Sequence, residues 1–256
     1  MFSSLFQTIF FQPILNLLVW LYAVVPGQDI GIAIILLTLV IKILLYPLTH
    51  VQIKQQRAMQ EIQPKIEEIR KRLKDNQEAQ AKELMELYKK EKVNPTASCL
   101  PLLLQLPVFI ALYHALSVGL ASKSFELLYP FVPNPQQIDP AFLGIFDLTT
   151  PNYVLAILAA LVQFWQTKQI LKPPAATVAT PPPEVINTEG AKDESMAAIM
   201  NKQMLYVMPI MTAVIGFSLP GGLTLYWLTM SVLTVLQQHF VMRKLPPKVT
   251  PQLNSN

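Results

Sequence analysis

The chain has 256 residues, of which 52% are hydrophobic and only 14% are charged. Soluble globular domains carry about 25% charged residues, so this composition argues against a soluble protein and predicts an integral membrane protein. The formal net charge is +4, and the basic residues are unevenly placed, because no Lys or Arg precedes Lys42. A secretory signal needs positive charge ahead of its apolar core, so we expect none here.

The first 28 residues are apolar between Leu5 and Val25, but four residues interrupt the run: Gln7, Gln12, Pro13 and Asn16. Such a segment could be a further span or an amphipathic helix that lies in the interface of the membrane. A further span would place the N-terminus inside the cell without a basic residue to hold it there. The pattern therefore favours an extracytoplasmic interfacial helix over residues 1–28.

Five later stretches are long and apolar enough, or nearly so, to cross a bilayer, which takes about 20 residues. The sequence predicts transmembrane helices at 29–48, 99–120, 151–171, 203–219 and 222–241. The last two are separated by "PGG" at Pro220–Gly222, so we expect them to form a tight helical hairpin. The sequence from Ser195 also favours helix, which would extend the fourth span into water.

The connecting segments alternate in charge, which predicts the orientation. Segment 49–98 carries 11 basic residues, 121–150 carries one, 168–202 carries four and the tail after residue 241 carries three; Lys42 completes the total of 20. Cytoplasmic loops are the ones enriched in Lys and Arg. We therefore expect the N-terminus outside, an outer loop at 121–150, a flexible cytoplasmic linker at 172–202 and a short basic cytoplasmic tail at 242–256.

The segment 49–98 is predicted to be a cytoplasmic helical hairpin. Ile62, Ile66, Ile69 and Leu73 follow helical spacing and form one apolar stripe. Its charged residues allow two interpretations: a solvated helix pair with internal ion pairs, or a contact surface for anionic partners such as lipid headgroups, ribosomal RNA or an acidic substrate segment. The candidate contact residues are Arg57, Lys65, Arg70, Lys71 and Arg72.

No motif in the sequence indicates an enzyme. The three histidines belong to different segments, and there is no P-loop, no GxSxG and no zinc-ligand spacing. We therefore predict no catalytic activity, no cofactor and no metal.

Lys42 is the most unusual residue, because it interrupts the first predicted span. A charge near the bilayer centre costs about 2.5–3.5 kcal/mol on insertion scales. Lys42 lies about 9 Å along the helix from Leu48, so its side chain could extend to the cytoplasmic interface instead. Other predicted spans carry polar residues at similar depth, and a bundle that turned them inward would enclose a wet, positively charged recess. On the other spans these residues are Gln105, Gln163, Gln166, Thr224, Ser231 and Thr234, and Thr38 lies one turn from Lys42 on the same face.

Three segments carry a family resemblance: "LTLVIKILLYPLTHVQ", "LYKKEKVNPTASCLPLLLQLPVFIALYHAL" and "FSLPGGLTLYWLTMSVLTVLQQHF". In this order they resemble the YidC family of membrane protein insertases, and the resemblance runs from about Leu5 to Arg243. It implies an all-α membrane protein with five transmembrane helices around a hydrophilic groove, an outer amphipathic helix and a cytoplasmic hairpin. It also implies a bacterial member without the large periplasmic domain that some members have.

The resemblance further implies which residues line the groove. One basic residue of the first span, usually Arg in the family, corresponds to Lys42. Matching the motifs adds Thr38, Gln105 and Trp227, with Gln163 on a looser match; Thr224 and Ser231 are the other polar candidates on the last span. Lys keeps the positive charge but lacks the two-pronged hydrogen bonding of Arg.

The implied function is energy-independent insertion of nascent or newly made proteins into the bacterial cytoplasmic (inner) membrane. The groove would hold polar segments of the substrate, and transmembrane segments would leave sideways into the bilayer. The expected partners are nascent membrane proteins and lipid, with the ribosome and the Sec translocon as further candidates and no DNA. Two rival functions fit the same recess: a transporter of small solutes or ions, and an assembly factor that binds membrane proteins without inserting them.

Overall fold

The computed structural model describes the backbone of residues 4–74, 76–94, 100–120, 126–171 and 196–244, and most of their side chains. Parts of five predicted segments lie outside these residues: 1–3 of the interfacial segment, 75 and 95–98 of the hairpin, 121–125 of the outer loop, 172–195 of the linker and 245–256 of the tail. Cys99 lies outside them too.

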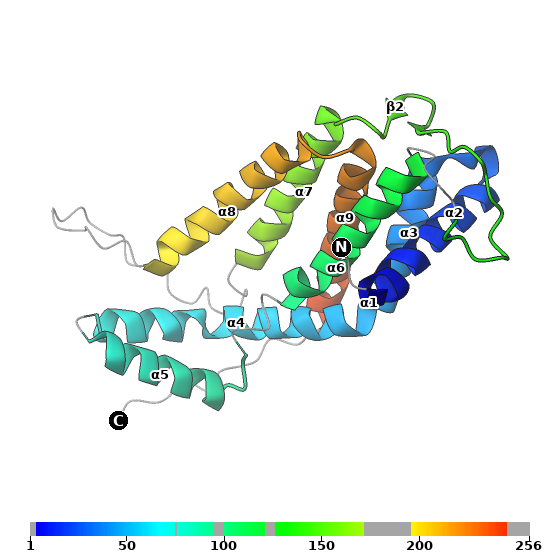
Figure 1. The fold of residues 1–256 in the computed structure, drawn as a ribbon. Coiled ribbons are helices and arrows are strands. Elements are labelled where there is room, and N and C mark those ends of the chain that lie inside the picture. Colours follow the sequence, from blue (N-terminus) through cyan, green and yellow to red (C-terminus); the bar gives the residue numbers. More distant parts are fainter. Residues whose placement is uncertain (1–3, 75, 95–99, 121–125, 172–195, 245–256) are drawn as a thin grey trace.

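The described residues are mostly helical, in agreement with the predicted all-α class. In Figure 1, α6, α7, α8 and α9 rise from one side of the long helix α4, and the α4–α5 hairpin projects far from the small β-ribbon. The elements in chain order are α1 (Ser4–Phe6), η1 (Gln7–Phe11), α2 (Gln12–Val24), η2 (Pro26–Gln28), α3 (Ile30–Leu44), α4 (Tyr46–Arg72), α5 (Gln77–Lys90), α6 (Leu100–Leu120), β1 (Ala141–Phe142), β2 (Phe146–Asp147), α7 (Tyr153–Leu171), α8 (Met196–Gly216) and α9 (Gly221–Lys244).

The largest apolar core joins α2, α3, α6 and the first turns of α9. Its fully buried members include Leu15 of α2, Ile34 of α3, Leu112 of α6 and Leu223 of α9. The helix that begins the chain is therefore packed against the bundle along one side. Burial of these side chains, each contributing about 1.5–3 kcal/mol, fixes α2 against α3 and α6.

The predicted first span, 29–48, is straight only as far as Leu44. There α3 ends, and α4 begins at Tyr46 after a bend of 69°. The cause is Pro47, which has no N–H to bond the carbonyl of Ile43 and is tolerated only in the first turn of a new helix. Residues 46–48 therefore belong to the hairpin helix and not to the span.

The helices differ in whether they are long and apolar enough to cross a membrane. Among the described residues, the run Ser4–Val24 is the one straight helix long and apolar enough to cross a membrane, and the bent pair α3–α4 passes only when counted together. The apolar parts Gln105–Ser117 and Leu205–Gly216 are shorter. The helix expected at the interface is thus long enough to span, so the choice between these alternatives rests on charge and not on length.

The start of α8 corrects one predicted boundary. The flexible linker was expected to reach residue 202, but α8 begins at Met196. The helical pattern from Ser195 onward, which was expected to lengthen the fourth span, agrees with this earlier start.

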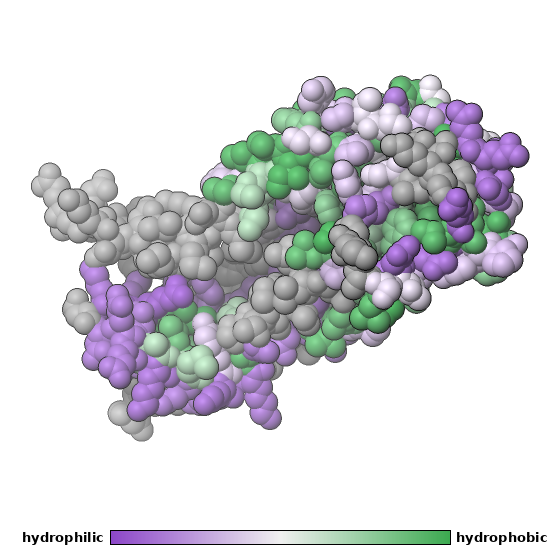
Figure 2. All heavy atoms as spheres, in the orientation of Figure 1, coloured by the Kyte–Doolittle hydropathy of each residue, from purple (hydrophilic) through white to green (hydrophobic). Residues whose placement is uncertain are grey.

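The hairpin α4–α5 buries three of the four residues of the predicted apolar stripe, Ile62, Ile66 and Ile69, and leaves Leu73 half-buried. Ile62 and Ile66 of α4 pack with Val93, which follows α5. The turn between the helices is closed by Asn76, whose side chain accepts a hydrogen bond from the backbone N–H of Ala79 (3.0 Å), as expected of an N-cap. Figure 2 shows hydrophilic residues gathered over this hairpin and apolar residues over the upper helices.

Residues 126–150, called the outer segment below, are hydrogen-bonded to three helices. Asp29 caps α3 through the backbone N–H of Ile32 (3.0 Å) and also accepts from the N–H of Leu143 (2.7 Å). Backbone N–H groups at the start of α9 donate to the same segment: Gly221 to Thr150 O (2.9 Å) and Gly222 to Leu148 O (3.0 Å). The outer segment thus ties the α8–α9 turn to the start of α3.

The β-ribbon lies within the outer segment, where β1 pairs with β2 in antiparallel register. After β2, the backbone N–H and the hydroxyl of Thr149 both donate to the carboxylate of Asp147, at 2.7 and 2.6 Å. These hydrogen bonds hold the pKa of the Asp147 carboxyl below its usual value. The turn therefore keeps its charged acceptor as the pH falls toward the ordinary range of aspartate.

We expect Gly31→Ala to destabilise the docking of this ribbon, because an added Cβ would overlap the ring of Phe142. Overpacking of this kind costs typically about 1–3 kcal/mol. A lower midpoint of thermal unfolding in detergent would show it. Gly31→Ala combined with Phe142→Ala removes the overlap with the ring but leaves the Cβ of residue 142, which lies 2.8 Å from the added Cβ, so it should regain part of the loss. Equal midpoints for wild type and Gly31→Ala would contradict this account.

Candidate functional site

Lys42 points into the helix bundle. It lies in the last turn of α3 with 8% of its surface exposed, and its Nζ donates to Thr234 Oγ1 of α9 (2.8 Å). The hydroxyl of Thr234 is already committed as a donor to the carbonyl of Met230 (2.7 Å). Its lone pairs are therefore free to accept from the amine. The side chain bridges α3 and α9 and does not extend along the lipid-facing surface.

The charge of Lys42 is not neutralised by an acidic partner in the described part of the chain. Three ion pairs lie in the hairpin region, and they join Arg57 to Glu61, Lys65 to Glu91 and Arg72 to Glu83. A buried cation without a counter-charge is costly, and such groups occur mainly where a function requires them. An ammonium group has three N–H donors, and Thr234 accepts a hydrogen bond from one of them.

Thr38 lies one helical turn from Lys42 on the same face of α3 and is fully buried. Its hydroxyl donates to the carbonyl of Ile34 (2.6 Å), as threonine in an apolar helix commonly does. Thr38 thus adds a small polar group beside the amine without neutralising it.

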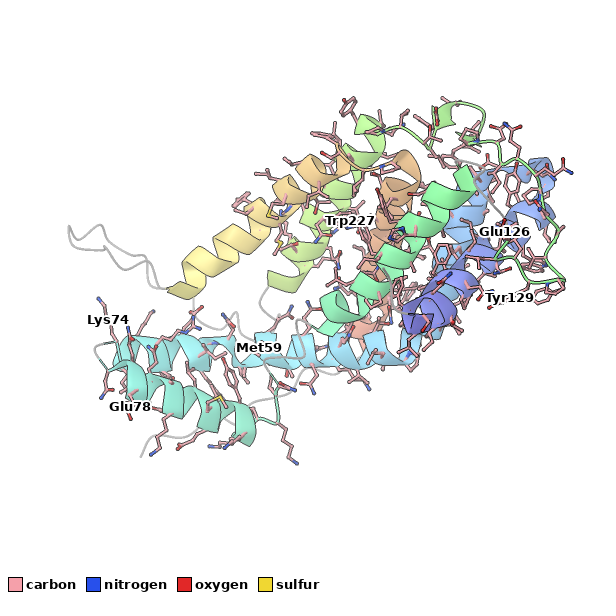
Figure 3. The ribbon with its side chains drawn as sticks, viewed as in Figure 1. Met59, Lys74, Glu78, Glu126, Tyr129 and Trp227 are labelled. Carbon is pink, nitrogen blue, oxygen red and sulfur yellow. The ribbon has the colours of Figure 1, made fainter. Side chains whose placement is uncertain are left out.

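A second polar contact joins α6 to α9. Gln105 Nε2 donates to the hydroxyl of Tyr226, which is buried. One residue further, Trp227 packs edge-on against Phe109, with ring centroids 6.1 Å apart. Figure 3 shows Trp227 among the upper helices, far from Lys74 and Glu78 at the tip of the hairpin. Sequence analysis missed Tyr226, although a tyrosine hydroxyl in an apolar span needs a hydrogen-bond partner.

The predicted groove residues do not form a single cluster. On α9, Thr224, Trp227, Ser231 and Thr234 follow spacings of three, four and three, so they share one face over about 15 Å. Thr224 and Ser231 are buried on this face. Gln163 is half-buried on α7, where its carbonyl accepts from Thr167 (3.0 Å). The structure therefore brings Lys42 to one end of the polar face of α9.

Beyond Lys42, α4 and α9 remain joined by polar contacts toward the hairpin. The Gln237 side chain is paired with Thr49 (2.8 Å), and Gln238 Nε2 donates to Gln56 Oε1 (3.4 Å). Further along, Arg57 donates to the carbonyl of Met242 (2.8 Å). None of these glutamines was predicted as a site residue. The helical spacing of polar residues along α4 and α9 is the sequence pattern that could have indicated these glutamines as site residues.

The five predicted contact residues of the hairpin differ in their surroundings. Arg57, Lys65 and Arg72 are engaged in the ion pairs given above. Arg70 is half-buried and its carbonyl accepts from Gln80 (3.2 Å), whereas Lys71 is exposed. Internal pairing thus uses three of the five positive charges, and the contact surface stays a prediction.

Comparison with known proteins identifies the family. The model of the 60Kd inner membrane protein family matches residues 20–248. The membrane protein insertase YidC of Oceanobacillus iheyensis is 38% identical over 242 residues, which cover 92% of this chain and 82% of that protein. The chain belongs to the YidC family. A YidC of Fusobacterium nucleatum is 35% identical over 216 residues, covering 84% of this chain and 87% of its own length.

The fold agrees with this membership. A crystal structure of an active YidC insertase, with its first transmembrane domain resolved, superposes with a TM-score of 0.58. It is 24% identical in sequence, and the match covers 93% of this chain and 47% of that one. The resemblance drawn from the three sequence segments is therefore confirmed. The YidC family is not a class of catalytic enzymes, and its relatives are bacterial inner membrane proteins.

Proposed function

We propose that this chain is a membrane protein insertase whose central element is the cation of Lys42, enclosed between α3 and α9. The observation that carries the proposal is a buried amine held by a hydroxyl and without an acidic partner among the described residues. Such an ammonium group is suited to bind an anion. Because the chain belongs to an insertase family, the ligand that fits is a polar or acidic segment of a client protein that is being translocated.

The physical task is to carry polar groups across a layer that cannot hydrogen-bond them. A hydrated groove that reaches from the cytoplasm to Lys42, lined by Thr38, Gln105, Gln163, Thr224, Trp227 and Ser231, would shorten that layer. The amine is enclosed in this structure, so a client must part side chains or helices to reach it. The polar face of α9 offers the path.

Two forces would drive insertion without a nucleotide. The membrane potential, positive outside, favours outward movement of negative charge by about 2.3 kcal/mol per charge per 100 mV. The apolar segment of the client would leave sideways into lipid, driven by its own burial. Lys42 would lower the barrier to translocation by binding the polar flank of the client when it is part-way across the membrane.

The proposed orientation has the N-terminus outside and the C-terminus in the cytoplasm, with five spans at the predicted positions. The helix Ser4–Val24 would lie at the extracytoplasmic interface, because no basic residue precedes Lys42. The hairpin α4–α5 would face the cytoplasm and meet the nascent chain first. The exposed charge of Lys71 and its neighbours supports contact with the ribosome, and the Sec translocon is a further candidate partner.

Reconstitution into liposomes tests this function. Purified protein should make a small single-span client resistant to added protease, without moving small solutes or ions. Solute flux without a client would favour a transporter. Client binding without protease protection would favour an assembly factor. Either result would contradict insertion.

A further inference from the structure

A row of uncharged polar side chains joins α4 to α9 between Lys42 and the hairpin. We call it the polar seam: Thr49, Gln52 and Gln56 on α4, and Thr234, Gln237 and Gln238 on α9. Thr49, Gln52 and Gln56 are spaced by three and four residues, so they lie on one face of α4. Thr49 and Gln56 contact α9, so Gln52 between them faces α9 as well.

Two buried atoms of the seam lack a hydrogen-bond partner. These are Gln52 Nε2 and Gln238 Oε1, on side chains that are 9% and 3% exposed. An unpaired buried polar atom costs about 1–3 kcal/mol. One of the two is a donor and the other an acceptor, and they belong to facing helices. A peptide group carries one C=O and one N–H, and so offers what this pair lacks.

We propose that the polar seam is a second, uncharged binding site for the main chain of a client's polar segment, on its way to Lys42. The proposal rests on the insertase function proposed above. Gln52 Nε2 would donate to a client carbonyl, and Gln238 Oε1 would accept from a client N–H. Lys42 would then recognise negative charge, and the seam would recognise the backbone common to every client.

The contacts that close the seam are of a kind that a client can replace. All are hydrogen bonds between neutral side chains, apart from the one that Lys42 donates to Thr234. Exchange of one neutral hydrogen bond for another changes the free energy little. The seam also lies beside the 69° bend at Leu45, about which α4 could swing away from α9. If α4 separated from α9 there, the glutamine side chains of the polar seam would be exposed in a row.

Two clients that differ only in their translocated flank separate the seam from Lys42. One flank is acidic, and the other is uncharged and rich in Ser and Asn. Gln52→Leu and Gln238→Leu should each lower insertion of the uncharged flank by a few-fold to about tenfold. The acidic flank, which Lys42 also binds, should be affected much less. The matched control is Gln77→Leu, because Gln77 is exposed on the hairpin.

Stability provides a readout that a merely structural role would move in the opposite direction. Gln52→Leu removes an unpaired buried donor, so the midpoint of thermal unfolding should stay the same or rise. Lower stability together with equal losses for both flanks would overturn the proposal. So would insertion at wild-type level for the uncharged flank.

A crosslinking experiment keeps the test decisive if a leucine variant accumulates poorly. In a Cys99→Ala background, Gln52→Cys should form a disulfide with a single cysteine in the client flank, whereas Lys54→Cys, at an exposed position of α4, should not. Equal crosslinking at both positions would overturn the seam. If the wild-type chain protects neither flank from protease, the proposed function fails. If it protects both, and the seam variants insert the uncharged flank as wild type does, this inference alone fails.

Discussion

Lys42→Ala should reduce insertion of clients with acidic translocated flanks by roughly ten- to a hundredfold. A hydrogen bond to a charged group contributes about 1.5–3 kcal/mol, and every 1.4 kcal/mol is a factor of ten. Lys42→Glu should be worse, because it places a negative charge where the flank must pass. The measurement is the protease-protected fraction of client in liposomes as a function of time.

Lys42→Arg is the matched control for this effect. It keeps the positive charge and adds a second donor prong, so insertion of the acidic flank should stay close to wild type. A client with a neutral flank should depend much less on the charge at position 42. Normal insertion of the acidic flank by Lys42→Ala would contradict the role assigned to this amine.

The second large effect is expected at Asn16, which fastens α2 to the outer segment. Asn16 is 3% exposed, its Nδ2 donates to Leu127 O (3.0 Å), and its Oδ1 accepts from the backbone N–H of Tyr129 (2.5 Å). Asn16→Leu leaves the N–H of Tyr129 without this partner, at about 1–3 kcal/mol if it stays buried. The carbonyl of Leu127 loses one of two donors and keeps the hydrogen bond from Gln12 Nε2 (3.2 Å). The midpoint of thermal unfolding should fall by several degrees.

Asn134→Leu is a suitable comparison, because Asn134 is exposed on the same outer segment and its side chain accepts only from the nearby N–H of Gln136 (2.9 Å). Its unfolding midpoint should stay near wild type. Limited proteolysis should cut the outer segment faster in Asn16→Leu alone. Equal behaviour of the two variants would show that Asn16 does not hold the outer segment.

Asn16 also illustrates what the sequence could and could not predict. As a polar residue in an apolar run, it argued against a membrane span over residues 5–25. The structure gives a different reason for its presence, since its side chain binds the main chain at Leu127 and Tyr129. These partners lie more than 100 residues away, and no local pattern connects them. The sequence indicated an exceptional residue but not its function.

The bend after α3 was predictable in principle. Pro47 stands in the apolar run, and the missing N–H of a proline interrupts a helix. The run was nevertheless expected to continue to Leu48, because hydropathy counts residues without regard to backbone hydrogen bonds. The burial of Ile62 and Ile66 follows from helical spacing alone and agrees with the structure; the cytoplasmic position of the hairpin stays a prediction.

The inward direction of Lys42 was implied by the family resemblance, whereas the residue pattern alone left two directions open. From the sequence, an amine at that depth could turn inward or extend to the interface, because both keep it solvated. The inward direction depends on Thr234, which is 192 positions away and was only one of several polar residues in the last span. Pairings between helices, including Gln105 with Tyr226, need the tertiary structure.

Solvent access to position 42 tests the central claim most directly. In a Cys99→Ala background, Lys42→Cys should react with a membrane-impermeant thiol reagent added from the cytoplasmic side. Ile43→Cys, at a neighbouring position that is 63% exposed and that the proposed arrangement places against lipid, should react far more slowly. Equal rates at the two positions would contradict a hydrated site at position 42 that faces the cytoplasm.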